Sequence, residues 1–229
     1  MELAKPHLDV GIYTSNHATV EFYRDSLRLP YESYVPLGGG IRQHRFNIYG
    51  SVLKVNHSRS PVGDGPPAGY GRITLAGDAN ARVGSLTDPD GNRLVLVPRG
   101  DAGTRSLKVD LNARDPEGCR RFYGEMLGLS RTGADGYLIG DSVVQIRDKP
   151  DHIPVPHSRH RGVRYITIQV QNVDQVYETL LSRGVRGVQP PRTLGKVARI
   201  AFVADPEENW IEISQRASYA GSVEAGGGS

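Results

Sequence analysis

Cysteine and histidine, two residue types that often carry out chemistry, occur once and seven times in this chain. The single cysteine, Cys119, falls in an amphipathic pattern typical of a helix, so we interpret it as a small buried hydrophobe. One cysteine cannot form an intrachain disulfide or a Cys-based zinc site. Among the seven histidines, His44 occupies a predicted strand between polar neighbours. It either lines the interior of the fold, where it could contact a substrate, or faces solvent.

The elements that must position such residues occur twice in the sequence. Residues 22–29, FYRDSLRL, match residues 122–129, FYGEMLGL, at an offset of 122 − 22 = 100. Residues 87–94, TDPDGNRL, match residues 204–211, ADPEENWI, at an offset of 204 − 87 = 117. The second half of the chain therefore repeats the first, with about 17 additional residues between the two landmarks.

Each half divides again into two units. Residues 18–27 have helical spacing, and residues 41–48 and 51–56 alternate like two strands that meet at Tyr49-Gly50. The same order recurs from residues 107 and 164, and the last helix is predicted to stop at Gly184. The unit that begins near Gly71 has only a short polar stretch where its helix should lie. We therefore predict four β-α-β-β-β modules, of which the second lacks a full helix.

The four modules, the recurring Phe-Tyr and Leu-x-Leu helix end and the recurring Asp-Pro-x-x-Asn hairpin resemble the vicinal oxygen chelate superfamily. This group includes glyoxalase I, extradiol dioxygenases and bleomycin-resistance proteins. The resemblance covers residues 7–215 and implies an α+β fold whose paired modules form two half-open, barrel-like halves. We place these halves at 1–99 and 104–216 and interpret residues 217–229, which end in GGGS, as a flexible tail.

Members of the family carry their metal ligands on the first strand of a module, usually as His, and on the last strand, usually as Glu. In many members these ligands hold a divalent metal inside the barrel. The corresponding positions here are Asp9, Lys54, Lys108, Gln145, Tyr165 and Glu212. His7 lies two residues before Asp9 and is expected on the same face of the strand. Of the strand positions, only Glu212 fits the usual ligand pattern.

The resemblance therefore implies acid–base chemistry more readily than a metal site. A protonated Lys108 does not ligate a metal, and it is expected to pair with Glu212 inside the barrel. Glu212 would act as a general base, Lys108 would stabilise a developing oxyanion, and Tyr165 would donate a hydrogen bond or a proton. This set suits isomerisation, cyclisation or elimination on a carbonyl- or phenol-bearing substrate. The expected substrate-binding residues are Asp9, His44, Lys54 and Gln145.

Three alternatives stay open. A metal-dependent glyoxalase-like or dioxygenase-like enzyme could use His7, Asp9 and Glu212 if the first and fourth modules pair, although Lys54 beside them would repel a cation. A non-catalytic protein could use the same barrel to bind a drug or metabolite. The polar residues could also be an ion pair that remains in a barrel without chemistry. The identity of any cofactor is not predicted, and a divalent metal is not favoured.

Composition narrows the partner classes. The formal net charge is +3 and the basic residues form no long run, so we expect no nucleic-acid partner. No apolar stretch approaches the roughly 18 residues of a membrane span, and residues 1–6 lack the apolar core of a signal peptide. We expect a cytoplasmic protein with a small-molecule substrate or ligand. By analogy with the family, we expect a homodimer.

Overall fold

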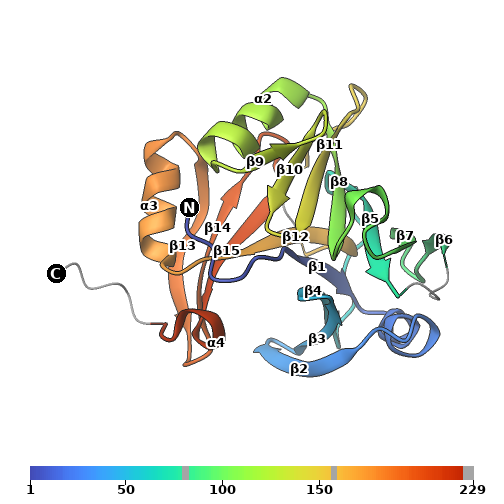
Figure 1. Ribbon diagram of the computed structural model, residues 1–229. Helices are drawn as coiled ribbons and strands as arrows, with labels where there is room; N and C mark the ends of the chain where they lie inside the picture. The colour runs from blue at the N-terminus through green and yellow to red at the C-terminus, as the bar shows by residue number, and fades with distance from the viewer. Residues whose placement is uncertain (79–82, 156–158, 224–229) are drawn as a thin grey trace.

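The structure is a computed structural model that describes residues 1–78, 83–155 and 159–223. Its strands form two sheets flanked by short helices (Figure 1). The first module contains β1 (Asp9–Thr14), α1 (His17–Glu21), β2 (Tyr31–Gly38), β3 (Ile41–Ile48) and β4 (Ser51–Ser58). The second contains β5 (Tyr70–Gly77), β6 (Gly84–Thr87) and β7 (Arg93–Pro98). The third contains β8 (Leu107–Ala113), α2 (Pro116–Arg121), β9 (Ser130–Thr132), β10 (Gly136–Ile139) and β11 (Ser142–Asp148). The fourth contains β12 (Gly162–Gln169), α3 (Val173–Ser182), β13 (Arg186–Leu194), β14 (Ala198–Ala204) and β15 (Trp210–Arg216), and α4 (Ala217–Ala220) follows it.

The two sheets each combine one module from either half of the sequence. The eight-stranded sheet has the order β13-β14-β15-β12-β1-β4-β3-β2, so the fourth module joins the first. The seven-stranded sheet has the order β6-β7-β5-β8-β11-β10-β9, so the second module joins the third. At the joints β1 runs antiparallel to β12 and β5 runs antiparallel to β8. The predicted α+β fold of paired modules is confirmed, and the pairing crosses between residues 1–99 and 104–216.

The helices begin where side chains can satisfy their first backbone N–H groups. Asn16 accepts from the backbone of Ala18 at the start of α1, and Asn172 accepts from Gln175 at the start of α3. Helices α1 and α2 each continue directly into a π-helical turn that contains the repeated Phe-Tyr pair. Helix α3 ends before Gly184, whose φ of +83° matches the predicted C-terminal glycine. No helix within the described ranges is long and apolar enough to span a membrane.

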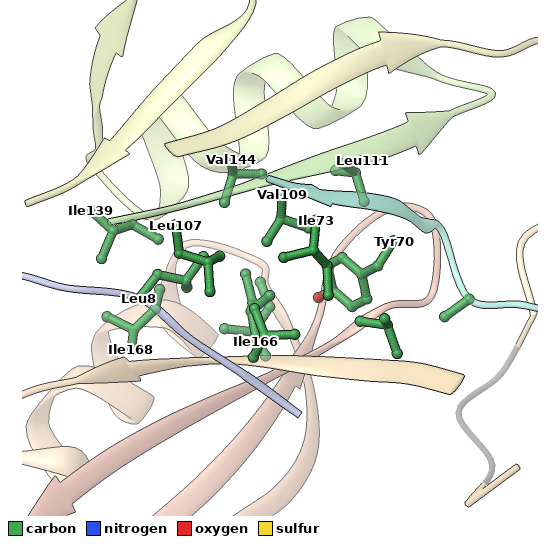
Figure 2. Close-up of a cluster of buried hydrophobic side chains, with 14 of the residues drawn as sticks. Leu8, Tyr70, Ile73, Leu107, Val109, Leu111, Ile139, Val144, Ile166 and Ile168 are labelled. Atoms are coloured by element: carbon green, nitrogen blue, oxygen red, sulfur yellow. The ribbon is translucent and has the colours of Figure 1, made fainter. Parts of the chain in front are cut away.

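The main hydrophobic core lies between the two sheets, which pack against each other through their apolar faces (Figure 2). Strand alternation produces these faces, because every second residue points to the same side. The eight-stranded side contributes Leu8, Ile166 and Ile168, and the seven-stranded side contributes residues such as Leu107 and Val109. All five side chains are completely buried. The opposite face of each sheet is thereby left available for polar residues.

The two repeated sequence motifs bind each other across the sheets. The Tyr23 hydroxyl donates to the Asp88 carboxylate over 2.8 Å, and the Tyr123 hydroxyl donates to Asp205 over 3.0 Å. Asp88 and Asp205 also accept backbone N–H groups of their own turns. Burial raises the pKa of Asp205 to about 6 and also raises the pKa of Asp88. The motifs therefore hold the modules together, and the Tyr23, Tyr123, Asp88 and Asp205 side chains have a structural role.

Two segments that the sequence predicts to be irregular, the β5–β6 connection and residues 217–229, are only partly described. Residues 78–83 connect β5 to β6, and the short polar stretch predicted in place of a helix falls largely on residues 79–82, which lie outside the described ranges. The first four residues of the predicted tail form α4, and residues 224–229 are also outside those ranges. The Lys5 ammonium lies 5.5 Å from the centre of the Tyr219 ring, which connects α4 to the segment before β1.

Candidate functional site: a buried polar cluster on the eight-stranded sheet

Four adjacent strands bring a set of polar side chains together on the face of the eight-stranded sheet that points away from the core. Strand β1 pairs with β12 so that Asp9 lies opposite Thr167 and Gly11 lies opposite Tyr165. The next strands on either side place Lys54 beside Gly11 and Glu212 beside Thr167. Residues that lie opposite one another in neighbouring strands point to the same face. The register therefore gathers an acid, a base and two hydroxyls in one place.

Lys54 and Glu212 form the centre of this cluster. The Lys54 ammonium lies 2.8 Å from Glu212 Oε2 and 2.7 Å from Thr167 Oγ1. The Thr167 hydroxyl donates to the same Glu212 oxygen over 2.6 Å. The side chains of Lys54 and Glu212 are only 5% and 12% exposed. Burial lowers the pKa of Lys54, and the nearby carboxylates of Glu212 and Asp9 oppose that shift.

The Glu212 carboxylate is held asymmetrically. Oε2 accepts from both Lys54 and Thr167, whereas Oε1 accepts no hydrogen bond from any residue in the described ranges. A carboxylate with one anchored oxygen and one unoccupied oxygen keeps its orientation while it retains a site that can accept a proton. This arrangement can support general base chemistry.

Tyr165 lies across β1, where Gly11 makes room for it. A Cβ atom at Gly11 would come within 2.0 Å of the Tyr165 ring, so any larger residue would displace the tyrosine. The Tyr165 hydroxyl accepts from Asn56 over 3.1 Å and from Gln43 over 3.5 Å. Burial, assisted by the negative charge of Glu212, raises the pKa of Tyr165 well above its ordinary value. The hydroxyl therefore stays protonated at neutral pH and can donate.

Asp9 lies on the same face but is fully occupied by the protein. Its carboxylate accepts from the Lys5 ammonium at 2.5 Å, from the backbone of Val52 at 2.8 Å and from Gln169 at 3.4 Å. Burial favours its protonated form, but Lys5 and Lys54 outweigh that effect, and the pKa of Asp9 falls below its ordinary value. Asp9 thus anchors the segment before β1, and the geometry gives it no free oxygen for a ligand.

The predicted partnership between Lys108 and Glu212 is wrong. Lys108 lies on β8 in the seven-stranded sheet, opposite Thr74 and Val143, because the third module pairs with the second. Lys54 takes the place beside Glu212 that Lys108 was expected to occupy. Gln145 lies on β11 of the same seven-stranded sheet and is likewise separated from the cluster.

His44 points away from the cluster. In the β3–β4 hairpin Gln43 lies opposite Asn56 and Arg45 lies opposite Lys54, whereas His44 lies opposite the core residue Val55. Its ring accepts from or donates to the Tyr31 hydroxyl over 3.0 Å. Burial lowers the pKa of His44 to about 4. The polar neighbours of His44 in the sequence, rather than His44 itself, face the cluster.

The residues of the cluster do not fit a divalent metal. The positions at the centre of the four strands are Gly11, Lys54, Thr167 and Glu212, and only one of these is an anionic ligand. The Lys54 ammonium already fills the place of a cation beside Glu212 Oε2. His7 packs against the turn at Gly50. No group of three or more His, Cys, Asp or Glu residues with metal-binding geometry occurs in the described ranges.

The sequence indicates only part of the roles of Lys54 and Thr167 beside Glu212. Lys54 was assigned to the last strand of its module, but its partner depends on which modules pair. Thr167 lies two residues after Tyr165 and therefore shares its face, yet the residue type alone carries no functional signal. Asn56 and Gln43, which hold the Tyr165 hydroxyl, were not identified for the same reason.

Comparison with known proteins agrees with this architecture. Residues 105–213 match the family model for the Glyoxalase/Bleomycin resistance protein/Dioxygenase superfamily. A glyoxalase I mutant from Zea mays superimposes with a TM-score of 0.71 at 14% identity, covering 96% of both chains. A putative dioxygenase from Bacillus subtilis superimposes with a TM-score of 0.65 at 16% identity, covering 98% of this chain and 92% of the other. At such identities the likeness concerns the fold alone. No curated protein matches the chain in sequence.

Proposed function

We propose that the chain, whose residues 105–213 match the family model for the Glyoxalase/Bleomycin resistance protein/Dioxygenase superfamily, is a small-molecule enzyme that uses acid–base chemistry at the cluster around Glu212. The observation that carries the proposal is the asymmetric Glu212 carboxylate, with Oε2 anchored by Lys54 and Thr167 and Oε1 without a partner in the described ranges. The proposal requires no metal ion at this site.

The proposed reaction begins with proton abstraction next to a carbonyl group or from a phenol. Glu212 Oε1 takes the proton, and the electron pair moves onto the substrate oxygen as an enolate or phenolate. Lys54 and the neutral Tyr165 hydroxyl supply positive charge and a hydrogen-bond donor for that oxygen. Return of the proton from Glu212 to a different atom completes an isomerisation, and departure of a neighbouring group completes an elimination.

Burial makes these electrostatic contributions large. Lys54 is 4% exposed and Tyr165 is 5% exposed, so water competes weakly with their interactions. Removal of a general base from such a site typically lowers the rate by about 10²- to 10⁴-fold. The same burial favours a second candidate, in which the cluster recognises a polar drug or metabolite without turnover. Both candidates place the ligand on the same face and differ only in whether a proton is transferred.

Proton exchange tests the proposal without knowledge of the natural product. Metal-depleted protein is incubated in D₂O with a panel of small ketones, aldehydes and phenols, and loss of the exchangeable carbon-bound protons is followed by ¹H NMR. We expect the wild type to accelerate exchange for at least one compound. The Glu212→Gln variant should lose this acceleration, whereas Glu178→Gln, at an exposed position on α3, should retain it.

Three outcomes of this experiment distinguish the acid–base enzyme from the alternatives. Exchange that persists in Glu212→Gln would contradict the assignment of the base. Exchange that occurs with the protein as purified but not with the metal-depleted protein would contradict the metal-independent chemistry. A compound that raises the melting temperature of the wild type but shows no exchange would support the binding protein instead. Circular dichroism and thermal unfolding of each variant show whether lost exchange reflects lost structure.

A further inference from the structure

The seven-stranded sheet has a second polar surface that the proposed function does not use. A cleft of about 1060 Å³ opens on it, and its lining includes residues of β5, β6, β7, β8 and β11. Further lining residues come from the loops around residues 64–68, 90–92 and 161–163. This volume is sufficient for a small organic molecule.

Two arginines share one carboxylate within this cleft. Arg72 on β5 lies opposite Asp110 on β8 and contacts Asp110 Oδ2 at 2.6 Å. Arg147 on β11 contacts the other oxygen, Oδ1, at 3.1 Å. The Asp110 side chain is 8% exposed, whereas those of Arg72 and Arg147 are 44% and 43% exposed. The carboxylate therefore serves as a buried anchor that holds two solvent-accessible guanidinium groups.

The arginines keep hydrogen-bonding capacity after this contact. A guanidinium group has five N–H donors, and Asp110 is the only partner that Arg72 or Arg147 has in the described ranges. Two positive charges share a single negative charge, so the group of three has a net charge of +1. Lys108 lies two residues before Asp110 on the same face of β8 and adds a further positive charge.

The acidic residues at the rim do not cancel this charge at the centre. Asp64 forms an ion pair with Arg161, and Asp90 lies 3.9 Å from the same guanidinium group. Apolar side chains also line the cleft, including Pro67 and Val95. The surface therefore combines a paired guanidinium site with an apolar neighbourhood, and this combination matches an anion that carries a hydrocarbon portion.

We propose that this cleft is a second ligand site that binds a small organic anion, with its carboxylate or phosphate group between Arg72 and Arg147 and its apolar portion against Pro67 and Val95. The two guanidinium groups supply charge-assisted hydrogen bonds to the oxygens of the anion. Asp110 fixes the spacing of the arginines before the ligand arrives, which reduces the entropy lost on binding. The site does not depend on the chemistry proposed for Glu212.

Calorimetric titration of the full chain tests the proposal. The probes are benzoate, phenyl phosphate, inorganic phosphate and the neutral benzyl alcohol. We expect at least one of the two aromatic anions to bind more tightly than inorganic phosphate and than the alcohol, and the preferred anion distinguishes a carboxylate ligand from a phosphate ligand. Arg72→Gln and Arg147→Gln should each raise Kd about tenfold or more, because each removes a charge-assisted hydrogen bond.

Matched variants make the outcome decisive. Arg42→Gln changes an exposed arginine on β3 of the other sheet and should leave Kd unchanged. Glu212→Gln should also leave Kd unchanged, so failure of the acid–base proposal does not affect this test. Absence of binding by both aromatic anions, equal binding of the alcohol, or retained affinity in Arg72→Gln and Arg147→Gln would overturn the proposal. If either variant fails to fold, amide chemical-shift mapping on the wild type replaces it, and shifts confined to residues that do not line the cleft would overturn the proposal.

Discussion

Replacement of Lys54 by methionine should destabilise the protein strongly, because it leaves the buried carboxylate of Glu212 without its positively charged partner. The ammonium of Lys54 lies 2.8 Å from Glu212 Oε2, and the two side chains are 5% and 12% exposed. Removal of one partner of a buried ion pair typically costs about 3–5 kcal/mol. Methionine keeps most of the length and apolar volume of the lysine stem, so the lost charge dominates the change.

Protonation limits this penalty and makes it depend on pH. A carboxylate that loses its partner can take up a proton, and for an ordinary Glu this costs about 4 kcal/mol at pH 7 and about 1 kcal/mol at pH 5. We therefore expect Lys54→Met to lower the free energy of unfolding by about 3–4 kcal/mol at pH 7. At pH 5 the loss should shrink to about 1–2 kcal/mol.

Urea unfolding measures both values. The fluorescence of Trp210, the only tryptophan in the chain, reports on β15 two residues before Glu212. Lys196→Met removes an exposed lysine and is the matched control. The double variant Lys54→Met/Glu212→Gln should be more stable at pH 7 than Lys54→Met alone, because no buried charge remains unpaired. A loss below about 1 kcal/mol in Lys54→Met, equal at both pH values, would refute the buried ion pair.

Four further outcomes follow from the structure. Gly11→Ala should cost about 1–3 kcal/mol in urea unfolding, because its Cβ would overlap the Tyr165 ring, and this cost should shrink in a Tyr165→Ala background. Asp205, whose pKa burial raises from 3.8 to about 6, holds a proton more tightly in the folded state, so its contribution to stability falls as pH rises through that window. Asp205→Asn should remove this part of the pH dependence of the melting temperature. His44 has the opposite effect, because burial lowers its pKa from 6.5 to about 4. Its contribution to stability is lost as pH falls through that range. The melting temperature of His44→Gln should therefore fall less on acidification than that of the wild type. Mass spectrometry of protein purified without chelator should find no stoichiometric Fe, Mn, Ni or Zn, and one equivalent per chain would contradict the role assigned to Lys54.

Much of the fold could be predicted from the sequence because it depends on local patterns. Alternation of apolar residues predicts the strands that build the core, and helical spacing predicts α1, α2 and α3. The repeats at 22–29 and 122–129 and at 87–94 and 204–211 predict four modules. The structure adds the reason for the repeats, since the tyrosine of one motif binds the aspartate of the other in both halves. The repetition reflects a structural lock, and the motifs contribute no side chain to the candidate site.

The candidate site was predictable only in part. Glu212 and Tyr165 were identified by their positions on the last and first strands of one module, and local register keeps them on one face. Lys108 was assigned to the same site by analogous spacing, but it lies on the other sheet. The cleft residues Arg72, Asp110 and Arg147 were not identified, because each is an ordinary polar residue on a strand until three strands bring them together.

The sequence by itself determined which residues form strands and which side chains share a face, because a strand has a period of two that side-chain type reveals. Only the tertiary structure decided which module lies beside which. That choice rests on backbone hydrogen bonds between β1 and β12 and between β5 and β8, and backbone groups are nearly identical for every residue. As a result Lys54, on the last strand of the first module, is the partner of Glu212, and Lys108, on the first strand of the third module, lies on the other sheet.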